Sequence, residues 1–338
     1  MNTNIFQLYD RTTTQFSEFD PSSIMLYSVP ASLTTNGYST PWNRELSETD
    51  KTFIGETYPN EGPDTGSFST TEVRTKAARS AVKRQVFAER LEVPPVLAIG
   101  LTSVDIAPTT NVRVTAYADK ITTTTADVHI NTWDDTTLFS AAATWFRAAA
   151  DDPDFQLGQA STLDSGRPQQ PQTAIPITFE RPYAAPPQVV VWLNRFEMGY
   201  ETNWRVAASA SDVTARGFVL HLDSAGDTTL LSASAAWIAF PAAKAGVAGG
   251  SFSTSDVRRW DQPEPVTRGQ IRFPQRGFAT PPSRVLVALN SLDMAAGHCL
   301  RLKVSAEKQS AQGAAWQIET WGGDSILYSA GASYLALA

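Results

Sequence analysis

The chain has 338 residues, of which 42% are hydrophobic and 18% charged, a balance typical of a soluble globular protein of two or three domains and not of a disordered or fibrous one. The formal net charge of −7 and a pI near 5.1, without a run of Lys or Arg, argue against nucleic acid as a partner. No apolar stretch reaches the length needed to cross a bilayer, so we expect no membrane insertion. Because no signal peptide is visible and the single cysteine, Cys299, cannot form an internal disulfide, we expect a cytoplasmic or non-classically secreted protein.

Residues 1–60 predict a short mixed or irregular segment with one helix. Residues 19–27 and 46–54 resemble the end of a metzincin zinc peptidase, a family in which a Met-turn lies under the zinc and a helix closes the domain. Met25 and Tyr27 match that turn, and we expect Met25 to be a packing residue. No HExxHxxGxxH motif precedes it, and the three histidines are scattered through the rest of the chain. We therefore expect no catalytic residue, no metal and no cofactor.

From residue 66 onward, one pattern occurs three times. The segment GSFSTTEVR at 66–74 returns as GSFSTSDVR at 250–258, and half of that offset leads to Gly158 with Ser161 and Asp164 in the expected places. Such a constant period indicates tandem repeats of one structural unit. We predict three domains, called repeat 1 (66–148), repeat 2 (158–242) and repeat 3 (250–338).

The local pattern inside each repeat predicts β-strands. Apolar runs at 96–99, 189–193 and 285–289 each follow a pair of prolines and are rich in β-branched residues. Residues 111–116 and 217–222 alternate between inward and outward types, as half-buried antiparallel strands do. The fold class that we predict is therefore all-β.

These repeats resemble the H-type lectin domain, the family of the snail agglutinins and of the C-terminal domain of discoidins. The similarity rests on a Phe followed by Pro-Pro, an Arg in the next strand, and a Thr-Trp hairpin that ends in an aromatic. The resemblance implies three tandem six-stranded antiparallel β-sandwiches and a sugar site between adjacent protomers of a trimer, typically for N-acetylgalactosamine. It assigns the Arg to one side of that site and, to the other, the hairpin Trp, the residue after it and a nearby aromatic. The residues carried over are Arg113, Trp133, Asp134 and Phe139 in repeat 1, Arg205 in repeat 2, and Arg301, Trp321, Gly322 and Tyr328 in repeat 3.

The repeats also depart from the family pattern. Repeat 2 has Ala225 in place of the Trp and Leu231 in place of the aromatic, which predicts a lost half-site. The residue after the Trp, a His in well-known members, is Asp134 or Gly322 here, which weakens the case for N-acetylgalactosamine. Since three copies stand in one chain, we expect a monomeric pseudo-trimer.

Three functions fit this sequence. The first is a multivalent lectin that binds glycans or glycoproteins, for N-acetylgalactosamine or galactose-type sugars. The second is the glycan-targeting accessory region of a truncated zinc metallopeptidase, and the third is a structural array without sugar binding. For each arginine the alternative to a sugar ligand is an ion pair with an acid, and for each hairpin Trp it is packing over a sheet edge. The acids in question are Asp105, Glu197 and Asp293.

Overall fold

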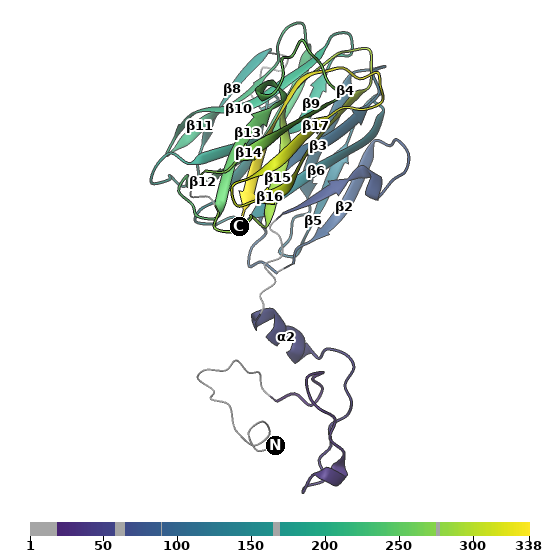
Figure 1. Ribbon diagram of the computed structural model, residues 1–338, viewed down its shortest axis with the longest axis vertical. Coiled ribbons are helices and arrows are strands. Elements are labelled where there is room, and N and C mark those ends of the chain that lie inside the picture. The colour runs from purple at the N-terminus through teal and green to yellow at the C-terminus, as the bar shows by residue number, and fades with distance from the viewer. Residues whose placement is uncertain (1–18, 58–64, 89, 165–169, 275–277) are drawn as a thin grey trace. The chain divides into compact units, whose positions relative to one another are not determined.

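The computed structural model describes residues 19–57, 65–88, 90–164, 170–274 and 278–338 (Figure 1). The chain divides into two compact units, Met1–Gly62 and Pro63–Ala338. Each unit is described separately below.

The described part of the first unit contains the short 3-10 helix η1 (Ala31–Leu33) and the helix α2 (Glu48–Thr57). Ser47 and Asp50 begin α2 with reciprocal bonds: the Ser47 hydroxyl accepts from the Asp50 amide at 3.0 Å, and the Asp50 carboxylate accepts from the Ser47 amide at 3.1 Å. The predicted helix is thus confirmed. The expectation that Met25 packs is wrong, because its side chain is 81% exposed.

The second unit is almost entirely β, as predicted. Its described residues form six strands in each repeat, with a short 3-10 turn after β1 (η2, Thr70–Glu72) and after β13 (η3, Thr254–Asp256). Repeat 1 contains β1 (Thr65–Ser69), β2 (Ser80–Val86), β3 (Val96–Ile106), β4 (Val112–Asp119), β5 (Thr125–Asn131) and β6 (Leu138–Ala148). Repeat 2 contains β7 (Gln156–Ser161), β8 (Gln172–Thr178), β9 (Gln188–Met198), β10 (Trp204–Thr214), β11 (Gly217–Asp223) and β12 (Leu230–Phe240). Repeat 3 contains β13 (Val247–Ser253), β14 (Val266–Arg272), β15 (Arg284–Met294), β16 (Leu300–Ser310), β17 (Gly313–Glu319) and β18 (Leu327–Leu337).

The eighteen strands form three antiparallel six-stranded sheets, and each sheet is shared by two repeats. Their strand orders are β1-β6-β3-β16-β17-β14, β13-β18-β15-β10-β11-β8 and β2-β5-β4-β9-β12-β7. Repeats 1 and 2 therefore join at β4–β9, repeats 2 and 3 at β10–β15, and repeats 3 and 1 at β16–β3. These three junctions close a ring within one chain, which leaves no repeat with an unpaired junction strand.

Each repeat encloses its own sandwich core between two half-sheets. The aromatic residues Trp145, Trp237 and Tyr334 are buried there, with exposed fractions of 4%, 8% and 6%. A repeated glycine lies under each ring: a Cβ at Gly66 would come within 2.3 Å of the Trp145 ring, and one at Gly158 within 2.5 Å of the Trp237 ring. The glycine that begins each copy of the sequence motif is thus required by the close approach of an aromatic.

A second cluster of buried residues joins the central strands of all three sheets. Three equivalent positions meet in it, and they carry Gly100, Trp192 and Ala288. A Cβ at Gly100 would lie 2.4 Å from the Ala288 Cβ and 2.6 Å from the Trp192 Cβ. One tryptophan therefore fills a space to which the other two repeats contribute only small residues, an asymmetry that a ring of three identical chains could not have.

Candidate functional site

An arginine crosses each junction of the ring. The Nε atom of Arg113 donates to Glu197 at 2.8 Å, whereas Arg205 and Arg301 lie 3.1 and 3.3 Å from the carboxylates of Asp293 and Asp105. We call each of these cross-repeat ion pairs a clasp. The strand register explains them, because Arg113 pairs with Glu197, Arg205 with Asp293, and Arg301 with Asp105 across the three junctions.

The same arginines also hold the hairpin of their own repeat. Nη1 of Arg113 donates to Asp135 at 2.6 Å and to the Thr136 hydroxyl at 3.0 Å. Arg205 donates likewise to Asp227, and Arg301 to Asp324, each at 2.6 Å. The Arg and the hairpin of one repeat therefore lie on the same side of each junction, which differs from the opposite-side arrangement that the resemblance implies. The reason is topological, since β4 and β5, which leads into the hairpin, are paired neighbours within repeat 1.

Burial and charge act in opposite directions at the clasps. Burial, the largest influence, raises the pKa of the Asp105 and Asp293 carboxyls, and the nearby guanidinium only partly offsets it. At the exposed hairpin, the hydrogen bond from Arg113 lowers the pKa of Asp135. The Arg113 side chain is 8% exposed, and its guanidinium is surrounded by carboxylates, so its charge is compensated within the protein.

The residue that follows the hairpin Trp, or Ala225 in repeat 2, has a left-handed backbone in each repeat. Asp134, Gly226 and Gly322 have φ angles of 55°, 61° and 92°. A Cβ at Gly322 would lie 2.1 Å from Nη1 of Arg301. Glycine at this position thus lets the hairpin backbone approach the arginine closely.

The predicted aromatic Trp133 is covered on one ring face. The guanidinium carbon of Arg195, which comes from β9 of repeat 2, lies 4.1 Å from the centre of the Trp133 ring. This contact is a cation–π interaction between two repeats. The other predicted aromatic of this repeat, Phe139, is 45% exposed.

Repeat 3 exposes its hairpin tryptophan. Trp321 is 36% exposed, and Ser103 stands in β3 at the position that Arg195 has in β9. Trp321 lines a shallow hollow of ≈ 230 Å³ together with Pro263, Pro265 and Leu327. No other described side chain stacks on its ring.

Trp260 is a candidate binding residue that the sequence did not single out. It is 62% exposed and lies edge-on to Tyr328, with ring centres 6.3 Å apart. Its loop, which continues to Pro263 and Pro265, is anchored by Arg258, whose guanidinium donates to the backbone carbonyls of Leu327 and Tyr328 at 2.8 and 2.9 Å. The sequence does contain a signal that could have identified Trp260. Repeat 1 has Lys76 at the equivalent position, so this tryptophan distinguishes repeat 3 from repeat 1.

Repeat 2 carries no aromatic at its hairpin. Ala225 and Leu231 stand in the places of Trp133 and Phe139, and Gly226 lies against the Arg205 guanidinium. Arg205 thus forms the cross-repeat ion pair of its junction, but the hairpin of repeat 2 has no aromatic side chain that could contact a sugar face.

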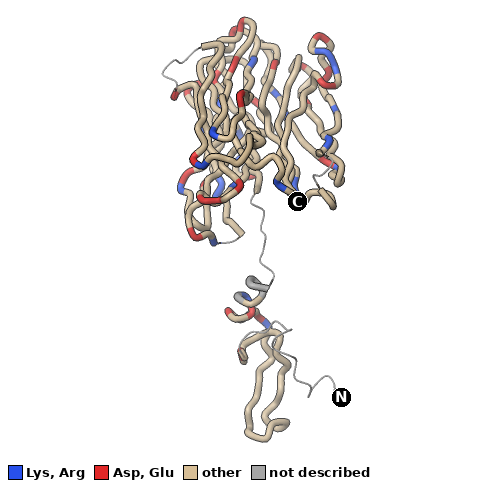
Figure 2. Tube along the Cα trace, turned by 90° about the vertical axis from the view of Figure 1, so that its left-hand side faces the viewer, with Lys and Arg blue, Asp and Glu red and all other residues tan. Residues whose placement is uncertain are grey.

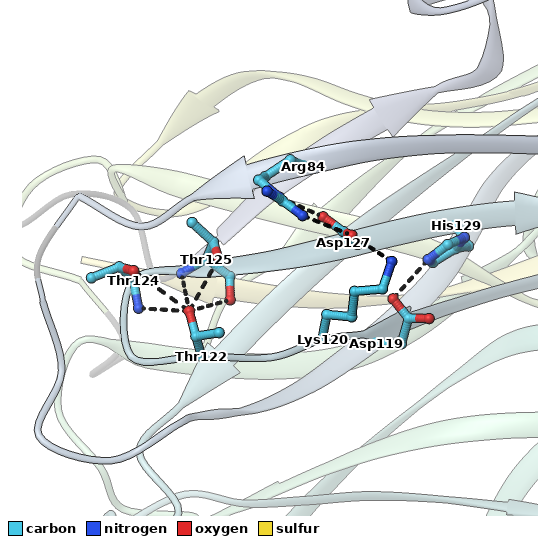
Figure 3. Close-up of polar contacts among 8 residues, drawn as sticks. All are labelled: Arg84, Asp119, Lys120, Thr122, Thr124, Thr125, Asp127 and His129. Carbon is cyan, nitrogen blue, oxygen red and sulfur yellow. Dashed lines mark hydrogen bonds and ion pairs between the residues drawn. The ribbon is translucent and has the colours of Figure 1, made fainter.

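The remaining titratable residues do not suggest a metal centre. His129 shares a hydrogen bond of 2.8 Å with Asp119, and Arg84 and Lys120 both pair with Asp127 nearby (Figure 3). Within the described ranges, no group of three His, Cys, Asp or Glu residues could hold a metal ion, and no helix is long and apolar enough to span a bilayer. Figure 2 shows basic and acidic residues interspersed along the strands and loops of the second unit.

The repeat pattern agrees with a known family model. A family model, the H-type lectin domain, matches residues 82–146, 174–240 and 268–337, which together make up more than half of the chain. A 63-residue stretch is 33% identical to a Fuscovulum blasticum protein described as "ATP synthase subunits region ORF 7", and the match covers 19% of this chain and 55% of that relative. The chain thus spans about half the length of that relative. The solved structure of recombinant discoidin II of Dictyostelium discoideum matches 48% of this chain and 82% of its own, with 11% identity and a TM-score of 0.24.

Proposed function

The chain belongs to the H-type lectin domain family, and from this premise we propose that it is a carbohydrate-binding protein whose open sugar site lies at the hairpin of repeat 3. The observation that carries the proposal is the exposed ring of Trp321 beside a shallow hollow, with Trp260 on the adjoining loop against Tyr328 of β18. Aromatic faces suit the apolar patch of a sugar ring, and the shallow shape suits a glycan end.

The polar part of this site comes from the hairpin. Nη1 of Arg301 lies 3.4 Å from the backbone carbonyl of Trp321 and 2.6 Å from Asp324. A carboxylate held in this way can accept hydrogen bonds from sugar hydroxyls while it stays ionised. We therefore place a neutral sugar over Trp321, with its hydroxyls toward Asp324. Galactose and N-acetylgalactosamine are the first sugars to test, since they are the type that the family resemblance implies.

The three junctions are not equivalent in this proposal. Arg195 occupies a face of Trp133, and repeat 2 has no ring, so only the site of repeat 3 offers an uncovered tryptophan. Multivalent binding by a single chain would require Arg195 to move away from the face of Trp133 that it covers. We further propose that the chain is monomeric, and mass photometry should then give a single species near 36.6 kDa.

A glycan array on the purified chain tests the proposal. Trp321→Ala should weaken binding to the best glycan about tenfold, or about 1.4 kcal/mol, because the apolar ring face is lost. Trp133→Ala is the matched control and should change binding less than twofold. Loss of binding in Trp133→Ala with full binding in Trp321→Ala would contradict the assignment.

A second candidate is the glycan-targeting region of a zinc metallopeptidase. It is supported by the first unit, where the Asp50 carboxylate of α2 accepts hydrogen bonds from the Ser23 hydroxyl at 2.5 Å and from the Ile24 amide at 2.8 Å. The turn that carries Met25 is thus tied to α2, the helix that stands where the resemblance to a metzincin places the closing helix. Reading the genomic sequence upstream of the Met1 codon tests this candidate, which requires an HExxHxxGxxH motif in frame.

A further inference from the structure

A polar hollow on the third sheet, away from Trp321, has features of a second binding site. Its volume is ≈ 260 Å³, and it lies where strands β4 of repeat 1 and β7, β9 and β12 of repeat 2 run side by side. At about 30 Å³ per water molecule, this space corresponds to roughly nine waters. Asn194 and Arg195 of β9 line it together with hydroxyl-bearing residues such as Thr115 and Ser234.

Arg195 is a half-buried arginine without a carboxylate partner among the described residues. Within the described structure, it forms a long hydrogen bond from Nε to the Ser232 hydroxyl at 3.4 Å and stacks on Trp133. The nearest acid in its strand, Glu197, is already hydrogen-bonded to Arg113. Burial lowers the pKa of Arg195, which reflects a charge removed from water without full compensation.

Asn194 adds an independent sign of a missing ligand. Its side chain is 3% exposed and donates from Nδ2 to Gln159 at 3.2 Å, while Oδ1 is buried and has no donor in the described structure. Buried amide oxygens are almost always hydrogen-bonded, so this orphaned acceptor needs an explanation. A hydroxyl group of a ligand in the hollow would supply the donor.

The other two sheets show that the fold does not require the combination of Asn194 and Arg195. The positions equivalent to Arg195 carry Ser103 and Ser291, which occupy the same register in β3 and β15. The position of Asn194 carries Thr102 in repeat 1 and Asn290 in repeat 3, and Asn290 Nδ2 donates to the Ser333 hydroxyl at 2.9 Å. The unpartnered arginine and the orphaned amide oxygen thus occur together on one sheet of the three.

We propose that this hollow binds a carboxylate-bearing sugar, with the carboxylate on the Arg195 guanidinium and a ring hydroxyl donating to Asn194 Oδ1. The planar guanidinium matches a carboxylate in a two-bond geometry. Asp164 at the rim, whose carboxylate accepts from the Ser161 amide at 3.0 Å, forms no ion pair with Arg195 in the described structure and can accept a second hydroxyl. The site does not depend on the neutral-sugar site at Trp321.

The test compares galacturonate with galactose by calorimetric or NMR titration in the Trp321→Ala chain, in which the proposed neutral-sugar site is weakened. Galacturonate should bind at least tenfold more tightly than galactose and than inorganic sulfate. Arg195→Ser, the residue that the other two sheets carry, should abolish this preference, and Asn194→Thr should weaken galacturonate binding several-fold. Arg195→Gln, which keeps a stem over Trp133, replaces Arg195→Ser if the latter fails to fold.

Three results would overturn the proposal. Equal binding of galacturonate and galactose removes the role of the carboxylate, and equal binding of sulfate shows a simple anion site. A preference that survives both Arg195→Ser and Arg195→Gln places the acid elsewhere. Since the measurement is made without Trp321, failure here leaves the proposed neutral-sugar site unaffected.

Discussion

The junction between repeats 1 and 2 is closed, whereas the junction between repeats 3 and 1 retains open surface. At the first, Arg113 donates a true hydrogen bond to Glu197, and Arg195 covers Trp133. At the second, the Arg301–Asp105 contact at 3.3 Å lacks hydrogen-bond alignment, since Oδ1 of Asp105 has no hydrogen-bond partner, and Trp321 is exposed.

Both junctions rest on the same strand register, so the difference comes from side chains alone. Three identical subunits must carry the same residues at every junction, but a single chain can change one junction without changing the others. A single chain with three repeats can therefore close one junction with its arginine and tryptophan and leave the tryptophan exposed at another.

The largest expected effect comes from removing a clasp arginine. Arg113→Ala should lower the free energy of unfolding by about 3 kcal/mol, because it leaves Glu197 half-buried without its partner. Arg301→Ala should cost about 1 kcal/mol, since its cross-repeat contact is not a formed hydrogen bond. Urea unfolding followed by circular dichroism measures both. Equal losses would show that the two junctions have the same strength.

A smaller effect is expected from adding one methyl group at the open hairpin. Gly322→Ala should destabilise the chain by about 1–2 kcal/mol, because φ is 92° and the new Cβ would displace Arg301 from Asp324. Gly323→Ala is the matched control: its φ is 75°, but no atom lies within 4 Å of the added Cβ, so only the backbone strain of about 1 kcal/mol remains. If the two substitutions lower the free energy of unfolding equally, the close approach to Arg301 does not contribute to stability.

The smallest effect is a difference in the pH dependence of the two junctions. The pKa of Asp135 is lowered in the folded protein, so its stabilising contribution is present above the unfolded pKa and is lost as the pH falls. The pKa of Asp105 is raised, so its contribution is greatest at acid pH and is lost as the pH rises through the folded value. The wild-type advantage in Tm over Asp135→Asn should therefore shrink from pH 6 to pH 3, while that over Asp105→Asn should grow. Parallel slopes would contradict the opposite pKa shifts.

The sequence predicted the repeats and their β-strands because a period of about 92 residues and runs of Val and Leu can both be read directly along the chain. Trp145 and Trp237, which close two of the repeats, are buried as aromatic residues of a core strand should be. The meeting of Gly100, Trp192 and Ala288 was not foreseen, because nothing in the linear pattern marks which of the equivalent positions meet at the centre of a ring.

The site was harder to predict than the fold. The structure shows the ion pairs of Arg113, Arg205 and Arg301 with Glu197, Asp293 and Asp105, and these pairs do not decide whether the arginines also contact a sugar. The cover of Trp133 by Arg195 joins residues 62 positions apart in different repeats, and it depends on a strand register that the sequence alone does not give. The role of the carried-over residues in sugar binding stays a prediction.

The central claim is that one neutral-sugar site per chain is open, and the stoichiometry of binding tests it most directly. Isothermal titration with the best neutral glycan from the array, checked by native mass spectrometry, should give one bound glycan per chain. Trp321→Ala should weaken that binding about tenfold, and Trp133→Ala should leave it in place. Two or three equivalent bound glycans per chain, or undiminished binding in Trp321→Ala, would contradict the account.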